Sequence, residues 1–222
     1  MSMTVTLKVN EIFKSIQGES SFAGKPCTFV RLSGCNLRCK YCDTEYAYND
    51  YREISCEEVI SEVKALKTPL VEITGGEPLM QAGTLELTKK LFDSGYRVLV
   101  ETNGSIDLRE ISSLREGREL FIIMDIKTPG SGMEEEIIWN NLNYLSQHDE
   151  IKFVIGGIGD FSWASGIVRQ YELDKKFTIH FSPVFGKIKP ADLCDWILGS
   201  NMDIRLNLQL QKIIWGDSQR GV

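Results

Sequence analysis

Residues 28–42 read TFVRLSGCNLRCKYC, a short apolar run that passes directly into a loop with three cysteines. Residues 28–32 predict a β-strand, because three of the five side chains are β-branched or aromatic. Along the rest of the chain, similar runs alternate with segments of helical spacing, and turn residues separate them. Strands that alternate with helices predict an α/β fold with a parallel sheet and helical crossovers.

The expected elements cover most of the chain, and the first helix is expected to begin with a capping box at Ser55 and Glu58. Strands are predicted at residues 4–13, 28–32, 70–74, 97–101, 120–126, 151–155, 177–181 and 204–210, and helices at residues 55–66, 84–92, 134–145, 161–171 and 190–198. A complete eight-unit barrel takes about 250 residues, so a partial, open TIM-like βα barrel of about six parallel strands is expected. No linker or repeat interrupts the pattern, and residues 1–222 are interpreted as one domain with a cysteine loop at 34–44.

Composition excludes several classes of protein. The formal net charge of -6 and the pI near 5.1 argue against a nucleic-acid partner. No apolar run approaches the roughly 20 residues of a membrane helix, so no membrane partner is expected. Residues 1–4 show no charged segment before an apolar stretch, and no signal peptide is expected. These features predict a soluble, cytoplasmic protein.

Three of the six cysteines follow the pattern Cys35-x3-Cys39-x2-Cys42. Disulfides are not expected in a reducing compartment, so metal or redox chemistry is the leading interpretation. Three thiolates on one loop can bind three irons of a 4Fe-4S cluster and leave the fourth iron open. A structural zinc ion would need a fourth ligand, for which Cys27 is the nearest candidate in sequence. Both interpretations remain open on spacing alone.

Each unusual motif directly follows a predicted strand. The cysteine loop follows 28–32, and the others are residues 75–77, 101–103, 125–127 and 182–183. The carboxyl ends of parallel strands meet at one rim, where α/β folds collect their chemistry. We therefore expect all these motifs to surround one site.

The cysteine pattern, with the aromatic Tyr41 before its last cysteine, resembles the signature of radical S-adenosylmethionine (SAM) enzymes. The run Gly75-Gly76-Glu77-Pro78 resembles the second signature of the same superfamily. The resemblance implies that SAM binds the fourth iron and is cleaved by one electron to methionine and a 5′-deoxyadenosyl radical, which takes a hydrogen atom from the substrate. The two glycines suit this role, because they allow close approach of a ligand to free backbone carbonyls.

A closer resemblance covers nearly the whole chain and points to the 7-carboxy-7-deazaguanine synthase family. Its residues are 11–19, 29–32, 42–44, 101–104 and 209–212. The resemblance implies conversion of 6-carboxy-5,6,7,8-tetrahydropterin to 7-carboxy-7-deazaguanine with release of ammonia, a step toward queuosine. It further implies hydrogen abstraction at C6, an Mg²⁺-assisted ring contraction, regeneration of SAM, a flavodoxin or ferredoxin-type electron donor and a homodimer.

The same resemblance implies a role for each site residue and assigns no catalytic side chain, because the cofactor carries the radical. Iron ligands are Cys35, Cys39 and Cys42, and Thr44 is the Mg²⁺ ligand. Residues expected to bind SAM are Tyr41, Cys42, Asp43, Gly76, Glu101, Asn103, Asp125, Ile126, Lys127, Ser182, Pro183 and Val184. Residues expected to bind substrate are Ile16, Gln17, Gly18, Glu19, Arg31 and Thr74. Arg31 suits bidentate capture of the substrate carboxylate.

Plainer interpretations of these residues stay open. Thr44 can cap the turn after Asp43, and Arg31 can form a surface salt bridge. Gln17 and Glu19 can belong to a solvated loop. For the whole protein, the alternatives are a different radical SAM enzyme, such as one that activates a glycyl-radical partner, and a non-enzymatic zinc or electron-transfer module.

The sequence departs from the family pattern at two positions. The family's entrance motif (residues 11–19 here) is usually followed by a glycine, where this chain has Ser20. The tail (residues 209–212) usually contains a histidine, which Gln211 replaces, so proton transfer by that histidine is in doubt. Residues 215–222 are interpreted first as a frayed end, and alternatively as a segment that reaches over a site or a neighbouring subunit. Cys27, Cys56 and Cys194 are interpreted as buried small side chains, and His148 and His180 receive no catalytic role.

Overall fold

Nine strands form one sheet in the computed structural model, which describes residues 5–216 and 220–222. Residues 1–4 lie outside the described residues, so the start of the first expected strand and the leader prediction are not compared. The strands are β1 (Thr6–Ile16), β2 (Pro26–Leu32), β3 (Arg52–Ser55), β4 (Leu70–Gly75), β5 (Arg97–Thr102), β6 (Leu120–Asp125), β7 (Glu150–Ile155), β8 (Thr178–Pro183) and β9 (Ile204–Leu206). The α-helices are α1 (Cys56–Leu66), α2 (Gly83–Asp93), α3 (Arg109–Ser113), α4 (Ile158–Tyr171), α5 (Pro190–Ser200) and α6 (Leu210–Trp215).

The order of the strands confirms an open, barrel-like α/β fold. It is β3-β1-β2-β4-β5-β6-β7-β8-β9, and the two end strands of this order do not pair in the described part of the chain. Strands β2 and β4 to β9 run parallel, whereas β1 pairs antiparallel with both β2 and β3. The sheet therefore has seven parallel strands, close to the six expected, and an antiparallel edge that the pattern did not predict.

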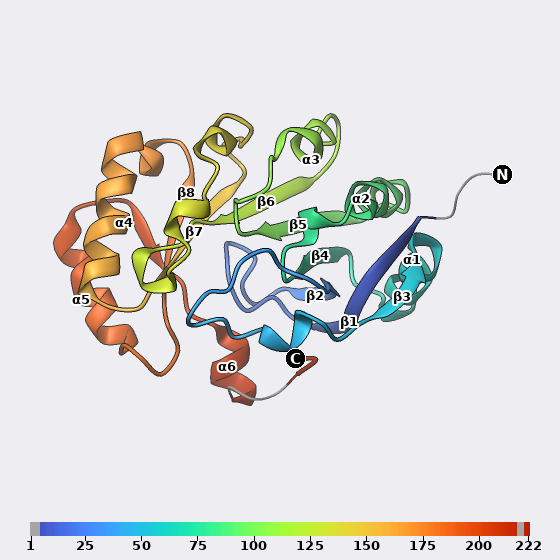
Figure 1. Ribbon diagram of the computed structural model, residues 1–222, viewed down its shortest axis with the longest axis horizontal. Coiled ribbons are helices and arrows are strands. Elements are labelled where there is room, and N and C mark those ends of the chain that lie inside the picture. Colours follow the sequence, from blue (N-terminus) through green and yellow to red (C-terminus); the bar gives the residue numbers. More distant parts are fainter. Residues whose placement is uncertain (1–4, 217–219) are drawn as a thin grey trace.

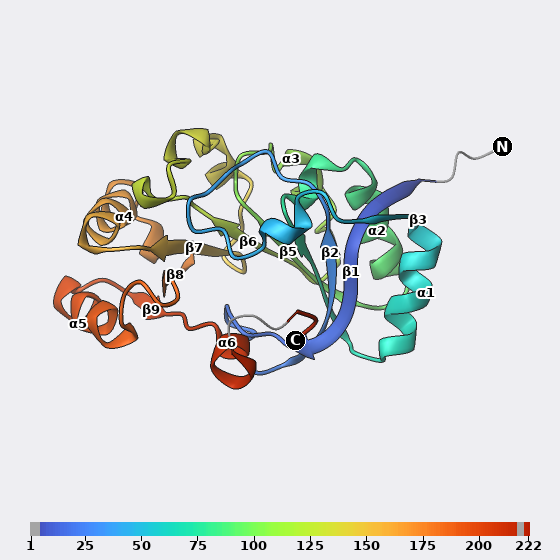
Figure 2. The same ribbon diagram turned by 60° about the horizontal axis from the view of Figure 1, so that its bottom comes forward.

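Helices α1 to α5 surround the outer face of the curved sheet, as Figure 1 shows. The larger hydrophobic core lies between them and the sheet, and includes Val59 of α1, Leu87 of α2 and Val168 of α4. The capping box of α1 is present, since the Ser55 hydroxyl accepts from the Glu58 N–H and the Glu58 carboxylate accepts from the Ser55 N–H. Helix α6 and the C-terminus lie on the concave side, close to β1 (Figure 2).

Two expected elements are wrong. The helix predicted at 134–145 is replaced by the short 3-10 helices Glu134–Glu136 and Trp139–Asn143. Here the buried Asn141 side chain donates to the carbonyls of Gly104 and Ile106, so loop contacts replace a regular helical ladder. The last strand ends at Leu206 instead of Leu210, because the Asn207 side chain turns to donate to the Ser182 hydroxyl.

The inner face of the sheet changes from apolar to charged toward the carboxyl ends of the strands. A second, smaller core of Cys27, Phe29, Leu70, Leu99 and Ile123, with Phe22, fills the inside near the amino ends. Closer to the carboxyl ends of the strands, the side chains on the same inner face are charged. They are Glu72, Glu101, Asp125 and Lys152. A charge inside a strand buried on both faces is costly unless it is paired, so this layer marks the site.

Candidate active site

A cavity of about 610 Å³ opens at the carboxyl ends of the strands. It brings together every residue that the sequence analysis assigned to iron, Mg²⁺, SAM or substrate, with one exception. The exception is Ile126, which is fully buried in the larger core and donates its backbone N–H to the Lys152 carbonyl. The expectation of one rim for all the motifs is therefore confirmed for their placement.

The cysteine loop is fixed by backbone contacts on three sides. The Gly34 N–H donates to the Ala47 carbonyl at 2.9 Å, the Glu77 N–H donates to the Gly34 carbonyl at 2.8 Å, and the Lys40 N–H donates to the Ser131 carbonyl at 3.0 Å. Gly34 has φ +95°, a conformation that favours glycine. Cys35, Cys39 and Cys42 are free thiols that all line the cavity.

Three thiols on one loop suit a 4Fe-4S cluster, and the candidate fourth ligand of a zinc ion, Cys27, lies away from them in the smaller core. Within residues 5–216 and 220–222, no group of three or more His, Cys, Asp or Glu side chains is placed to hold a single metal ion. A zinc ion needs four ligands around one point, whereas a 4Fe-4S cluster binds each thiolate through a different iron. Cys27, the candidate fourth zinc ligand, is fully buried in the smaller core, at the opposite end of β2 from the cysteine loop.

The two glycines after β4 allow this loop and the sheet to approach closely. A Cβ at Gly76 would lie against the Gly34 carbonyl and the Cys35 side chain, well inside van der Waals contact. Gly75 has φ +136°, and a Cβ there would overlap the backbone of Leu32. The pair therefore leaves the end of β4 beside the thiols, where its backbone is open to a ligand.

The cavity holds a network of paired charges. The Lys152 ammonium contacts the carboxylates of Glu19 and Glu101 and lies 3.7 Å from Asp125 Oδ2. Burial opposes the charge of Lys152, but the three carboxylates outweigh it and raise the pKa of this lysine well above its usual value. Lys152 is therefore a cation that neutralises and orients carboxylates, not a base.

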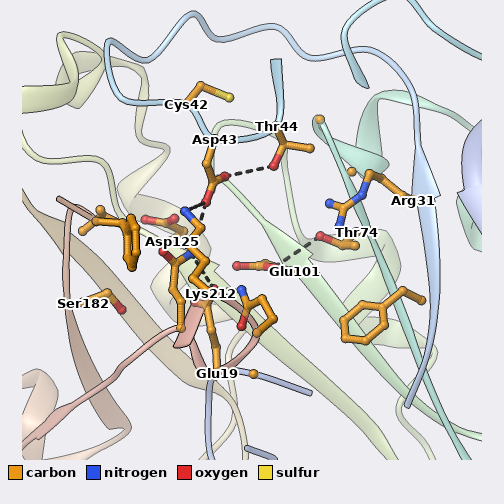
Figure 3. Close-up of a pocket in the computed structure, with 18 of the residues that line it drawn as sticks. Glu19, Arg31, Cys42, Asp43, Thr44, Thr74, Glu101, Asp125, Ser182 and Lys212 are labelled. Carbon is orange, nitrogen blue, oxygen red and sulfur yellow. Dashed lines mark hydrogen bonds and ion pairs between the residues drawn. The ribbon is translucent and has the colours of Figure 1, made fainter. Parts of the chain in front are cut away.

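A second charged group lies near the last cysteine (Figure 3). Asp43 Oδ2 accepts from the Lys212 ammonium at 2.8 Å and from the Gln209 amide at 3.1 Å, while the Thr44 hydroxyl donates to Asp43 Oδ1 at 2.9 Å. Burial would raise the pKa of Asp43, but these contacts, Lys212 foremost, hold it well below its usual range. Thr44 thus lines the cavity and also makes the turn contact expected of a cap.

Arg31 lies on the wall opposite, between the rings of Phe13 and Tyr46. Its side chain is 17% exposed, and its Nε donates to Glu11 Oε1 at 2.8 Å. Within residues 5–216 and 220–222 the two terminal nitrogens of the guanidinium donate to no protein acceptor, so a carboxylate can bind them in a bidentate manner. In Figure 3, Arg31 lies beside Thr74, whose hydroxyl donates to Glu101 at 3.3 Å.

The entrance loop is more tightly bound than a solvated loop. The Gln17 side chain is 3% exposed; its amide donates to Glu72, and its oxygen accepts from the Glu19 N–H. Glu19 accepts from Lys152, Gln209 and Asn207. Ser20, at the position of the usual glycine, has φ +61°, so the loop keeps the left-handed conformation that glycine favours.

Two charged residues inside strands, Glu72 and Lys152, belong to none of the motifs that the sequence marks. Glu72 and Lys152 both line the cavity, although their strands were predicted. The signal was present in LVEITG, where Glu72 is the one charge in an apolar strand, and in EIKFVI, where Glu150 and Lys152 alternate with apolar residues. The predicted site consists of motifs at strand ends and of the loop at residues 16–19, and so it does not include these two residues.

The C-terminal segment contributes to the cavity wall. Gly216 and residues 220–222 line it, and the Arg220 guanidinium lies 3.9 Å from the centre of the Tyr46 ring. This agrees with a tail that reaches over a site; residues 217–219 lie outside the described residues. Gln211 also lines the cavity, beside Gly18, and as an amide it carries no titratable proton.

Comparisons with known proteins identify relatives of this chain. The Radical SAM superfamily family model matches residues 29–160. The chain is 41% identical to the 7-carboxy-7-deazaguanine synthase of Koribacter versatilis strain Ellin345, over 97% of this chain and 100% of that protein. It is also 41% identical to the 7-carboxy-7-deazaguanine synthase of Chlorobaculum tepidum, over 100% of each chain.

The crystal structure of QueE from Escherichia coli has the same fold. It aligns with a TM-score of 0.75 at 24% sequence identity, and the alignment covers 92% of this chain and 94% of that chain.

Among the residues that the structure describes, no helix is long and apolar enough to cross a membrane.

Proposed function

We propose a specific reaction for this chain, which belongs to the 7-carboxy-7-deazaguanine synthase family of the radical SAM superfamily and is a radical SAM lyase. The reaction is the conversion of 6-carboxy-5,6,7,8-tetrahydropterin to 7-carboxy-7-deazaguanine with release of ammonia, as a step of queuosine biosynthesis. The non-enzymatic zinc or electron-transfer module is thereby set aside.

One observation carries the proposal: three thiols and a free guanidinium fork line the same cavity. Cys35, Cys39 and Cys42 would hold a 4Fe-4S cluster, and the backbone at Gly76 would contact SAM. Bound there, the cluster and SAM would supply the radical chemistry expected to remove hydrogen from C6 of the substrate. Arg31 would bind the substrate carboxylate, and this contact would hold the C6 atom of the substrate at a fixed position relative to the three thiols.

Thr44 is the residue proposed to bind Mg²⁺. Mg²⁺ prefers hard oxygen ligands and keeps several waters, so one protein hydroxyl suffices beside substrate oxygens. Asp43, which stays ionised, accepts from Thr44 and so fixes the direction of the hydroxyl. The ion would assist the ring contraction by stabilising negative charge that develops on the substrate.

A flavodoxin or ferredoxin-type protein would supply the electron, and the protein would act as a homodimer in the cytoplasm. The cavity of about 610 Å³ has the size of a small-molecule site, which favours a pterin over the loop of a large glycyl-radical partner.

The test is an anaerobic assay with reconstituted protein, SAM, Mg²⁺, reductant and 6-carboxytetrahydropterin. We expect brown protein with about four irons per chain and formation of 7-carboxy-7-deazaguanine. Fully loaded protein that cleaves SAM but forms no deazaguanine would overturn the assignment of the substrate and leave the radical SAM chemistry in place.

A further inference from the structure

Glu72 is a buried carboxyl group on the cavity wall to which the sequence assigns no role. It lies inside β4 and is 2% exposed, and its Oε2 accepts from the Gln17 amide. Burial, together with the nearby Glu101 carboxylate, raises the pKa of Glu72 to about 8. Burial of a carboxyl group is costly unless hydrogen-bond donors compensate for the lost water. Gln17 donates to only one of the two Glu72 oxygens, so a further donor can bind.

The neighbours of Glu72 form a surface for a flat ring. The rings of Phe13 and Phe29 stack with centroids 5.0 Å apart and an interplanar angle of 11°, and both line the cavity. Phe29 is paired with Glu72 in the register of β2 and β4, so aromatic face and carboxyl group are adjacent. A planar heterocycle that packs against these rings would present its edge to Glu72.

Glu72 and Arg31 are spaced to hold the two ends of one bicyclic ligand. Arg31 pairs with Thr74 in the same register, two residues further toward the carboxyl ends. Two residues of a strand span about 6.6 Å, and neighbouring strands lie about 4.8 Å apart. The resulting separation of Glu72 and Arg31 on the sheet is comparable with the length of a fused two-ring heterocycle. Such a ligand carries a carboxylate at one end and N–H donors at the other.

Glu19 is less suited to this task. Its oxygens already accept from Lys152, Gln209 and Asn207, so a ligand would have to displace protein donors. Among the residues that the structure describes, the Glu72 carboxyl accepts only from the Gln17 amide.

We propose that Glu72 reads the guanine-like edge of the substrate by accepting hydrogen bonds from its 2-amino group and N3–H, while Arg31 holds the carboxylate. The inference rests on the proposed function and deepens it, because it names the group that distinguishes an amino-pterin from its 2-oxo analogue. Two N–H donors of the ligand favour the ionised form of Glu72. They thus replace the hydration that this carboxylate loses by burial.

The experiment compares two stable ligands on the holoenzyme. 6-Carboxypterin has no hydrogen atom on C6 to abstract, and 6-carboxylumazine replaces its 2-amino donor by an oxygen acceptor. For the wild-type protein we expect 6-carboxypterin to bind at least about tenfold more tightly, because the lumazine oxygen faces the carboxylate. In Glu72→Gln the amide can donate to that oxygen, so the preference should fall to less than about threefold.

Two further variants keep the inference falsifiable. Glu72→Asp retains the charge and should retain the preference at lower affinity, and Glu110→Gln, an exposed change on α3, should leave both affinities unchanged. Unchanged SAM binding shows that each variant keeps an intact cavity. If Glu72→Gln discriminates as the wild type does, the role of Glu72 is wrong and the substrate assignment stands. If the wild-type protein binds neither ligand, both are wrong.

Discussion

The buried carboxylate of Glu77 accepts a hydrogen bond from the backbone N–H of Asn103 at 2.7 Å, which joins the loop after β4 to the loop after β5. It also accepts from the Thr102 hydroxyl and the Leu79 N–H. Glu77→Gln replaces one acceptor oxygen by a donor that faces these donors. We expect the free energy of unfolding to fall by about 1–3 kcal/mol and SAM affinity to fall with it. Urea denaturation and equilibrium binding measure the two, with Glu110→Gln as the control; wild-type values for both would contradict the role.

Replacement of any one cluster thiol should remove the iron. In Cys35→Ala, Cys39→Ala and Cys42→Ala we expect loss of the brown colour, of about four irons per chain and of SAM cleavage, because each thiolate binds a different iron. Cys194→Ala is the matched control, since this thiol does not line the cavity. Iron analysis and visible absorption after anaerobic reconstitution give the answer. Full iron content in any of the three variants would exclude that cysteine as a ligand.

The hydroxyl of Thr44 should set the Mg²⁺ requirement without affecting the cluster. Thr44→Ala removes one oxygen ligand, and we expect the Mg²⁺ concentration for half-maximal product formation to rise about tenfold or more, with unchanged iron content. Thr44→Ser keeps the hydroxyl and should titrate like the wild type. A Thr44→Ala protein with a wild-type Mg²⁺ titration would leave only the turn contact with Asp43.

Loss of the Arg31 guanidinium should weaken substrate binding much more than SAM cleavage. A charge-assisted pair contributes about 1.5–3 kcal/mol, so Arg31→Ala should raise the KM for the pterin by about 10–100-fold. Arg31→Lys keeps the charge without the fork and should recover part of this loss. SAM cleavage without substrate should change little. Equal KM values for wild type and Arg31→Ala would place the guanidinium outside the substrate site.

The raised pKa of Glu72 makes stability depend on pH. Because the folded-state value of about 8 exceeds the ordinary value of 4.5, the contribution of this group to stability is complete below pH 4.5 and is lost as the pH rises toward 8. Between pH 6 and pH 8.5 we expect the wild-type protein to lose roughly 1–3 kcal/mol relative to Glu72→Gln. Urea denaturation of both proteins across this range measures the difference. Parallel pH profiles would show that Glu72 does not titrate in this window.

Local patterns predicted the parts of this molecule that local chemistry determines. Seven strands, the capping box at Ser55 and the convergence of the motifs follow from alternating hydrophobicity, turn residues and the geometry of parallel strands. The predicted helix at 134–145 failed because Asn141 exchanges helical hydrogen bonds for contacts with the distant loop at Gly104. The predicted end of β9 was wrong for a similar reason, because Asn207 binds Ser182 and Ser20.

The site was predictable as far as its residues resemble known motifs. Roles that depend on contacts between distant parts of the chain were not predictable. For example, no residue near Lys152 in sequence indicates that its ammonium lies among Glu19, Glu101 and Asp125. Gln17 shows the same limit: the motif marks it as important, but only the fold shows that its amide faces Glu72.

The contacts between the entrance loop and helix α6 join the two ends of the chain at the cavity. The Leu210 N–H donates to the Gly18 carbonyl at 3.0 Å, and Lys212 pairs with Asp43. These contacts span almost the entire sequence, which gives the catalytic centre a high contact order and places its completion late in folding. During translation the three thiols are therefore synthesised well before Leu210 and Lys212, whose contacts complete this wall of the cavity.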